Sequence, residues 1–521
     1  MNAQQLRAML GDGGELALID VREELIFSQN HLLLARSVAL SRFELKFATL
    51  VPRRAARIVL CDDADGLAER AAGILARNGY SDVSILDGGV AAWAAAGFEL
   101  FSGVNVPSKA FGEFIEHSSG TPSIAAEELE QLLRTGADLV VLDSRPFDEY
   151  ARVSIPTAVN VPGAELVLRA RELAPSPRTT VVVNCAGRTR SIIGAQSLIN
   201  AGLPNRVLAL RNGTMGWSLA GFVCDNGQSR RAPGVSAATL QWARQAAKGV
   251  AQNCGVKAID SAGLERLRTD AERTTYLFDV RDPAEYEAGH LPGAISAPGG
   301  QLVQATDQYV GTLGARIVLV DDAEVRALMT ASWLRQMGWQ DVFVLAEAGT
   351  EIGRPGAQAL ETEIGSSAAI DLASFGELFA RHAATVVDLS PSRDYLKEHI
   401  PGAWFAIRTR LERALEKIPL RDTLVLTSED GVLAAMAVAE AAALVNVPVR
   451  FLAGGNAAWR AAGYELSTEA LMADEIVDQW RKPYERSGDA KAAMREYLAW
   501  EIDLLSRVER DGLLKFSRVG Q

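Results

Sequence analysis

The sequence predicts an α/β protein of four tandem modules, each a small parallel sheet with helices on both faces, followed by a C-terminal helical tail. Three observations lead to this fold class. A strand-like apolar run ending in Asp occurs four times, a second apolar run follows each at nearly constant spacing, and an Ala-rich helical stretch follows each second run. The length of 521 residues agrees with it, since it corresponds to about three to four domains.

The predicted first strand of each repeat ends in an aspartate. The runs LALID, LVVLD, TYLFD and TVVD end at Asp20, Asp143, Asp279 and Asp388. Short apolar runs rich in β-branched residues that end in a polar turn are typical of buried strands. Eleven residues after each aspartate stand His31, Ser154, His290 and His399, and the last two lie in the motifs GHLPGA and EHIPGA. We interpret His290 and His399 as structural.

The predicted second strand leads into a short loop and then a helix. The runs RIVLC, TVVVNC, RIVLV and TLVLT precede loops that open 42, 42, 42 and 40 residues after the aspartates, at Asp62, Cys185, Asp321 and Ser428. Ligands of parallel α/β sheets bind beyond the carboxyl ends of the strands, where these loops lie. Three copies close with a turn and a tryptophan, at Trp93, Trp217 and Trp459, whereas the third has Ala348-Gly349-Thr350 there.

The repeat spacing divides the chain into modules and connecting segments. The predicted modules span residues 1–104, 121–229, 256–353 and 366–467, and the tail spans 468–521. The first and third connections, SGVNVPSKAFGEF and GRPGAQALETEIGSS, are predicted linkers. The second contains AATLQWARQAAKGVAQ, which is predicted to be a helix. The tail segment MREYLAWEIDLLSRVERDGLLKF has helical spacing, and we expect it to pack on the modules.

Composition excludes several classes of protein. A net charge of −12 argues against a nucleic-acid partner, which would require clustered positive charge. No run of 18 apolar residues occurs, so we expect no membrane span, and the first residues lack the apolar core of a signal peptide. Four cysteines and five histidines without zinc-ligand spacing predict neither a disulfide scaffold nor a metal site. We therefore expect a cytoplasmic protein with no cofactor.

The loop of the second repeat carries the residues best suited to chemistry. It has the sequence Cys185-Ala186-Gly187-Arg188-Thr189-Arg190-Ser191 and leads into a helix. Loop N–H groups, the helix N-terminus and the two arginines all favour an anion, so we expect a lowered pKa for Cys185 and a thiolate nucleophile without a separate base. The same positive cradle would hold a dianionic sulfur donor and then a persulfide.

The other cysteines and loops show no comparable pattern. Cys61 lies one place earlier in its repeat than Cys185, on the predicted strand, and Cys224 and Cys254 lack basic neighbours, so we interpret all three as structural. The carboxylates of Asp62 and Asp321 cannot form a persulfide and would cap the following helix. Ser428 lacks an adjacent base. Modules one, three and four are therefore predicted to be inactive.

The motifs together resemble the rhodanese (thiosulfate sulfurtransferase) family. The resemblance rests on the D-x-R strand ends, on GHLPGA and EHIPGA, on the loop CAGRTRS and on the turn before the tryptophan. It covers all four modules and is similar to bacterial multidomain rhodanese-related sulfurtransferases. It implies small α/β modules and a loop cysteine that takes sulfane sulfur from a donor and passes it to a thiophilic acceptor.

The resemblance implies a role for each residue of the second module's loop. Cys185 would form the persulfide, and substrate would be bound by Ala186, Gly187, Arg188, Thr189, Arg190 and Ser191. Asp143 and Arg145 match the D-x-R strand end and would support the site, or form a structural salt bridge, since the inactive copies keep the same pair. The implied partners are a small donor, thiosulfate or glutathione persulfide, and a thiol or cyanide-like acceptor. A homo-oligomer stays an open alternative.

Two other functions stay open at this stage. Three modules without cysteine would also suit a scaffold or binding protein with little catalysis. A cysteine-loop phosphatase or arsenate reductase has the pattern C-x5-R, but here Arg190 is the fifth residue after Cys185, so the loop is one residue short. A sulfurtransferase is the function that the sequence favours.

Overall fold

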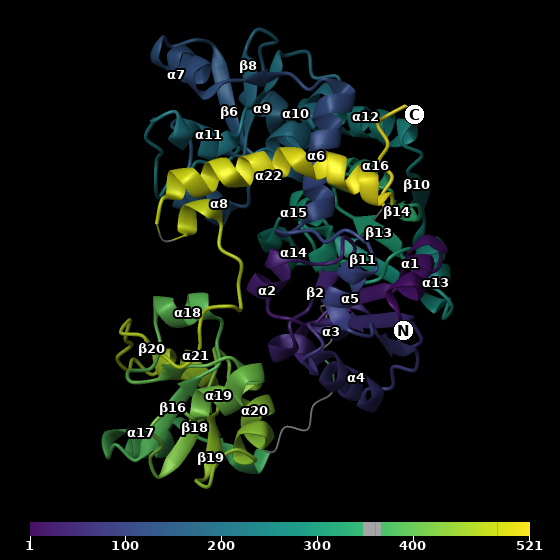
Figure 1. Ribbon diagram of the computed structural model, residues 1–521. Coiled ribbons are helices and arrows are strands. Elements are labelled where there is room, and N and C mark those ends of the chain that lie inside the picture. The colour runs from purple at the N-terminus through teal and green to yellow at the C-terminus, as the bar shows by residue number, and fades with distance from the viewer. Residues whose placement is uncertain (347–359, 361–365, 487, 521) are drawn as a thin grey trace.

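Four parallel sheets flanked by helices make up the computed structural model, which describes residues 1–346, 360, 366–486 and 488–520 (Figure 1). The predicted fold class is therefore confirmed. Within each sheet the neighbouring strands run parallel. The segment Ala348-Gly349-Thr350 lies outside the described residues. Among the described residues, no helix combines the length and the hydropathy that a membrane span requires.

The first module contains a four-stranded sheet in the order β2-β1-β3-β4. Its strands are β1 (Ala17–Asp20), β2 (Arg36–Ser37), β3 (Ile58–Cys61) and β4 (Val83–Ile85). Its helices are α1 (Ala3–Gly11), α2 (Glu24–Gln29), η1 (Leu40–Arg42), α3 (Phe43–Leu50), α4 (Leu67–Arg77) and α5 (Gly89–Ala95). The central strands are buried on both faces, as their continuous apolar runs predict.

The second module has a five-stranded sheet in the order β5-β9-β8-β6-β7. Its strands are β5 (Ser123–Ile124), β6 (Leu139–Asp143), β7 (Val159–Asn160), β8 (Thr180–Asn184) and β9 (Val207–Leu210). Its helices are α7 (Ala126–Arg134), α8 (Phe147–Arg152), η2 (Gly163–Glu165), α9 (Leu166–Leu173), α10 (Thr189–Asn200) and α11 (Gly213–Leu219). Asp143 pairs with Asn184, so Cys185 follows β8 at the same edge of the sheet.

The third module repeats this arrangement in the order β10-β14-β13-β11-β12. Its strands are β10 (Lys257–Ile259), β11 (Thr275–Asp279), β12 (Ile295–Ser296), β13 (Arg316–Val320) and β14 (Val342–Leu345). Its helices are α13 (Ser261–Thr269), α14 (Pro283–Ala288), α15 (Gly299–Gln304), η3 (Thr306–Gln308) and α16 (Arg326–Gln336).

The fourth module has the sheet order β15-β19-β18-β16-β17-β20, where β20 comes from the predicted tail. Its strands are β15 (Ala369–Ile370), β16 (Ala384–Asp388), β17 (Trp404–Phe405), β18 (Thr423–Thr427), β19 (Val449–Leu452) and β20 (Leu471–Met472). Its helices are η4 (Ser366–Ala368), α17 (Leu372–Ala380), α18 (Ser392–Lys397), η5 (Arg408–Arg410), α19 (Leu411–Leu415), α20 (Val432–Ala442) and α21 (Gly455–Ala461).

Three helices outside the sheets connect and cover the modules. Part of the first predicted linker is in fact helical, as α6 (Val106–Ser119), because its apolar residues recur at helical spacing and pack against α10. The second connection forms α12 (Ala237–Asn253), as predicted. The tail forms η6 (Pro483–Glu485) and then α22 (Ala490–Asp511), which returns from the fourth module to lie across α6 and the second module (Figure 1).

Modules two and three pack against each other through equivalent segments. Arg190 of α10 donates to Gln301 of α15 at 3.2 Å, and Arg326 of α16 donates to Glu165 of η2 at 2.8 Å. Arg326 and Gln301 stand at the positions of module three that correspond to Arg190 and Glu165 of module two. The interface is therefore reciprocal, as in an isologous dimer, and it is made within one chain.

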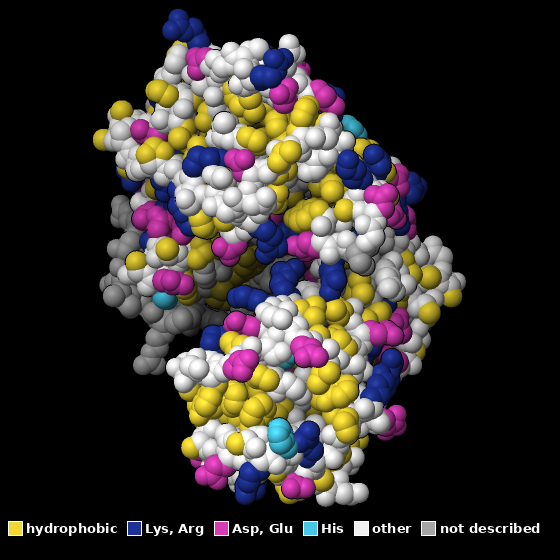
Figure 2. Space-filling view, turned by 90° about the vertical axis from the view of Figure 1, so that its left-hand side faces the viewer, with side chains coloured by type: hydrophobic (Ala, Val, Ile, Leu, Met, Phe, Trp, Pro, Cys, Tyr) yellow, Lys and Arg dark blue, Asp and Glu magenta, His cyan; other side chains and the backbone are white. Residues whose placement is uncertain are grey.

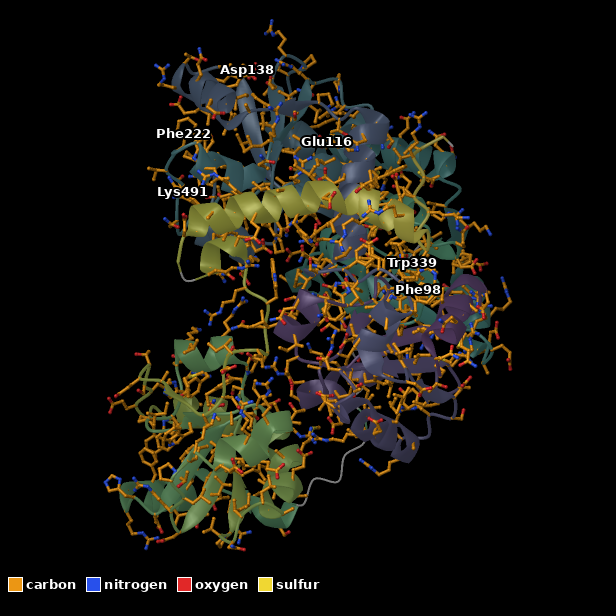
Figure 3. All side chains as sticks on the ribbon, in the orientation of Figure 1. Phe98, Glu116, Asp138, Phe222, Trp339 and Lys491 are labelled. Atoms are coloured by element: carbon orange, nitrogen blue, oxygen red, sulfur yellow. The ribbon has the colours of Figure 1, made fainter. Side chains whose placement is uncertain are left out.

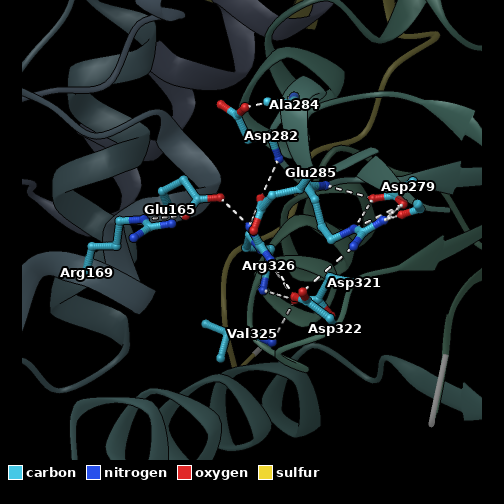
Figure 4. Close-up of polar contacts among 12 residues, drawn as sticks. Glu165, Arg169, Asp279, Asp282, Ala284, Glu285, Asp321, Asp322, Val325 and Arg326 are labelled. Atoms are coloured by element: carbon cyan, nitrogen blue, oxygen red, sulfur yellow. Dashed lines mark hydrogen bonds and ion pairs between the residues drawn. The ribbon is translucent and has the colours of Figure 1, made fainter. Parts of the chain in front are cut away.

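Arg326 is a buried cation at this interface, with only 2% of its side chain exposed. It contacts four carboxylates drawn in Figure 4, those of Glu165, Glu285, Asp321 and Asp322. A buried ion network loses stability mainly when one member is removed and its partners stay buried without compensation. Arg326 therefore holds together the third module's loop and its contact with the second module.

We predict that Arg326→Leu lowers the free energy of unfolding by about 3 to 5 kcal/mol, because it removes the cation shared by the buried carboxylates of Glu165 and Asp321. Arg134, which is 69% exposed and pairs with Glu130, is the matched control. Arg134→Leu should change the free energy of unfolding by less than about 0.5 kcal/mol. Urea unfolding followed by circular dichroism measures both. Equal effects of the two substitutions would contradict the role of Arg326 in holding the third module's loop and its contact with the second module.

Candidate functional site

Cys185 lies between the end of β8 and the first turn of α10, at the carboxyl edge of the second sheet. Its carbonyl oxygen accepts hydrogen bonds from the Thr214 amide at 2.8 Å and from the Thr214 hydroxyl at 3.0 Å. Gly213 has φ +54°, and a Cβ there would lie 2.3 Å from the Cys185 carbonyl oxygen. Only glycine fits this approach, so the turn that begins α11 fixes the cysteine loop.

The equivalent loops of the three copies without the cysteine bind their own side chains. Asp62 accepts hydrogen bonds from two amides of its loop at 2.9 Å. Asp321 accepts three, at 3.0, 3.2 and 2.9 Å, of which the one from Val325 is drawn in Figure 4. The Ser428 hydroxyl accepts one from Ala434 at 3.3 Å. These side chains occupy the position of Cys185, so in modules one and three an internal carboxylate fills the anion-binding loop.

The Cys185 thiol is buried, with the residue only 2% exposed, and this burial raises its pKa above the ordinary value. The charge of Arg190 and contacts with Ser191 lower the pKa in part, while the charge of Glu501 raises it. The sequence prediction of a lowered pKa is therefore wrong, since neither the burial nor the glutamate was visible in the loop sequence. The free protein holds Cys185 mainly as the thiol.

Of the two loop arginines, Arg188 forms an ion pair with α6. Its guanidinium donates to both carboxylate oxygens of Glu113 on α6, at 2.7 and 2.8 Å, and also contacts Glu116. Arg190 donates to Glu149 of α8 at 2.9 Å. The predicted full positive charge of Arg188 is thus compensated by α6, and Arg190 is the arginine whose charge acts on Cys185.

Asp143 and Arg145 form a salt bridge in which both side chains are completely buried. Arg145 donates to the two carboxylate oxygens of Asp143 at 2.8 and 2.7 Å and to the Val153 carbonyl at 2.6 Å. Asp20 with Arg22 and Asp279 with Arg281 form the same pair in modules without the cysteine. This geometry favours the structural alternative for Asp143 and Arg145.

A cleft of about 550 Å³ opens in front of Cys185 and is lined by all four modules. Module one contributes Glu24 and Arg42, module three Gln301 and Gln304, and module four Arg393. Figure 2 shows a hollow across the middle of one face, with Lys and Arg side chains gathered around it. Of the six residues after Cys185 that were predicted to bind substrate, five line this cleft, and Ser191 does not. The modules without the cysteine thus contribute to its walls.

Several cleft residues come from outside the repeats and were missed by sequence reasoning, among them Lys109 of α6 and Tyr497 and Glu501 of α22. Lys109 is 3% exposed, donates to the Tyr497 hydroxyl, and lies 4.7, 5.1 and 5.6 Å from the ring centres of Tyr497, Trp500 and Trp480. Glu501 accepts a hydrogen bond from the Thr189 hydroxyl at 2.5 Å. The one available sequence signal was that Tyr497 and Glu501 are four residues apart, on one helix face.

The comparisons with known proteins agree with this geometry. The family model described as Rhodanese-like domain matches residues 2–96, 125–220, 263–351 and 371–462. A solved structure of thiosulfate sulfurtransferase from Pseudomonas aeruginosa is 49% identical, covers 100% of this chain and 99% of its own, and has a TM-score of 0.95. The putative sulfur carrier protein YrkF of Bacillus subtilis is 25% identical over 135 residues, which are 24% of this chain and 71% of that relative. The HTH-type transcriptional regulator Rv0324 of Mycobacterium tuberculosis is 33% identical over 109 residues, 21% of this chain and 47% of its own length.

The chain belongs to the rhodanese-like domain family, with four copies of the domain. Its full-length likeness to a sulfurtransferase makes it a rhodanese-type sulfurtransferase, which confirms the predicted enzyme class. Lys109, Tyr497 and Glu501 lie outside the four matched ranges.

Because burial raises the Cys185 pKa and the thiolate is the reactive form, we predict that alkylation of Cys185 by iodoacetamide accelerates about tenfold per pH unit from pH 7 to 9. Glu501→Gln should accelerate alkylation at pH 7, because it removes a charge that disfavours the thiolate. Peptide mass spectrometry gives the rate at Cys185. A rate that levels off below pH 8 would contradict the raised pKa.

Proposed function

We propose that this chain moves sulfane sulfur from thiosulfate or a related persulfide donor to a thiophilic acceptor through a persulfide on Cys185. The observation that carries the proposal is the difference among the four equivalent loops. In modules one and three a carboxylate accepts the loop N–H groups, whereas in module two the side chain at that position is a thiol facing a cleft. The P. aeruginosa relative is named as a thiosulfate sulfurtransferase, which supports thiosulfate as the donor.

The first step with thiosulfate needs no cofactor. The Cys185 thiolate attacks the outer sulfur, a new S–S bond forms, and the bond to the central sulfur breaks, so that sulfite leaves with the electron pair. Charge balances, since a thiolate and a dianion give a persulfide anion and sulfite. The guanidinium of Arg190 and the N–H groups from Ala186 to Ser191 would stabilise the negative charge on sulfur in both thiolate and persulfide.

The second step returns the cysteine to its starting state. An acceptor thiolate or cyanide attacks the outer persulfide sulfur, the S–S bond to Cys185 breaks, and its electron pair returns to the Cys185 sulfur. Arg190 would again stabilise the thiolate that leaves. Because burial raises the Cys185 pKa, turnover should increase with pH across neutrality as the thiolate fraction grows.

Modules one, three and four are proposed to be inactive and to shape the cleft. An aspartate has no sulfur to accept, and its charge already fills the loop of modules one and three. In module four the Ser428 hydroxyl is 3% exposed and lies beside Glu429 and Asp430 without a basic partner among its described contacts. Their contribution would be the cleft residues Arg42, Gln301 and Arg393.

We predict that thiosulfate treatment adds about 32 Da to the Cys185 peptide, the mass of one sulfur, and that Cys185→Ser abolishes this adduct and sulfur transfer. Cys61→Ser and Cys254→Ser are controls, because both thiols lie outside the cleft lining, and they should keep transfer within about twofold. Peptide mass spectrometry and thiocyanate formation measure the two effects. Transfer that persists in Cys185→Ser would contradict the proposal.

A further inference from the structure

The lining of the cleft includes two buried charges of opposite sign that lack ion-pair partners. Lys109 and Glu501 are 3% and 2% exposed and both line the cleft. Among the described residues, no carboxylate lies within 4.0 Å of the Lys109 ammonium and no Lys, Arg or His nitrogen within 4.0 Å of the Glu501 carboxylate. Two other cleft cations do have ion-pair partners, Arg42 with Asp478 and Lys482 with Glu149.

One oxygen of Glu501 also lacks a hydrogen bond. Its Oε1 accepts from the Thr189 hydroxyl, but its Oε2 is buried and has no partner among the described residues. This Oε2 lies 3.2 Å from the point where a Cβ on Gly187 would be, so it faces the loop two residues after Cys185. A buried carboxylate oxygen without a donor is costly, and a ligand that brings an N–H or an ammonium group would remove that cost.

Lys109 offers the complementary group. An ammonium has three N–H donors, and one is used by the Tyr497 hydroxyl. The faces of Tyr497, Trp480 and Trp500 stabilise the cation away from water without neutralising it. Burial lowers the Lys109 pKa to about 8, so the side chain is still mostly charged at pH 7. It can therefore bind a carboxylate at short range.

We propose that this pair makes the cleft a site for amino-acid thiols, which carry an ammonium and a carboxylate on the carbon next to the thiol-bearing group, as cysteine does. Glu501 Oε2 binds the ammonium, Lys109 binds the carboxylate, and the thiol sulfur is directed to the outer sulfur of the Cys185 persulfide. The inference rests on the proposed function and names the class of its acceptor. It concerns residues of α6 and α22, outside the repeated modules.

The transfer step itself is the one given above. The acceptor thiolate attacks the outer sulfur, the bond from that sulfur to Cys185 breaks, and the electron pair returns to the Cys185 sulfur while the amino acid leaves as its persulfide. Lys109 and Glu501 touch the acceptor away from the reacting sulfurs. They act by orientation, so their contribution should appear as discrimination among acceptors.

The test compares four acceptors in single turnovers of the sulfur-loaded protein. The acceptors are cysteine, 3-mercaptopropionate without the ammonium, cysteamine without the carboxylate, and 2-mercaptoethanol without either. Loading is first measured by the mass of the Cys185 peptide, so failure to load tests the proposed function and not the acceptor class. Loss of the extra sulfur then gives each rate, expressed per acceptor thiolate. Cysteine should react at least about tenfold faster than each of the others, the size of one charge-assisted hydrogen bond.

Two variants assign the two contacts. In Glu501→Gln, cysteine should react no faster than 3-mercaptopropionate but still faster than cysteamine. In Lys109→Met, cysteine should react no faster than cysteamine but still faster than 3-mercaptopropionate. Glu496→Gln and Lys491→Met remove the same charges from exposed positions of α22, and Lys491 lies at the outer end of that helix (Figure 3). Both controls should leave the discrimination unchanged.

Two results would overturn the proposal. Equal rates per thiolate for all four acceptors with the unmodified protein would do so without any variant, which covers the case in which Lys109→Met does not fold. A Glu501→Gln protein that is slower with every acceptor by the same factor would assign Glu501 a purely structural role through Thr189.

Discussion

The backbone N–H groups that open the helix after the second long strand need an acceptor in every module. In modules one and three the acceptors are the carboxylates of Asp62 and Asp321, which complete the loop without a ligand. In module two Cys185 stands there, and a thiol is a weak acceptor until it becomes a thiolate or a persulfide. The same backbone N–H groups are therefore satisfied by an internal carboxylate in modules one and three, whereas in module two they are suited to bind an anionic sulfur.

The remaining modules give this loop its surroundings. Reciprocal contacts of Arg190 and Arg326 join modules two and three, and the cleft before Cys185 receives side chains from all four modules. The tail then returns along α22 and places Glu501 on Thr189, at the first residue of α10. The repeated modules thus form walls around Cys185, and the segments outside the repeats contribute Lys109 and Glu501, two charges of opposite sign without ion-pair partners among the described residues.

Much of this arrangement was predictable because it is encoded locally. The strand ends at Asp143 and Asp279 and the constant spacing to the loops predict the fold class, and the residues after Cys185 predict a loop at a helix N-terminus. The Cys185 pKa was predicted with the wrong sign because it depends on burial and on Glu501, more than 300 positions away. Likewise, nothing in the sequence near Arg188 shows that Glu113 compensates its charge. Contacts between distant segments carry no local pattern.

The central claim is that a single sulfur-accepting thiol serves the four modules. The most direct measurement is the amount of sulfur that the protein carries after treatment with excess thiosulfate and removal of the donor, determined as thiocyanate on adding cyanide. The account predicts about one thiocyanate per chain and none from Cys185→Ser. Two or more per chain, or the same amount from Cys185→Ser, would contradict it.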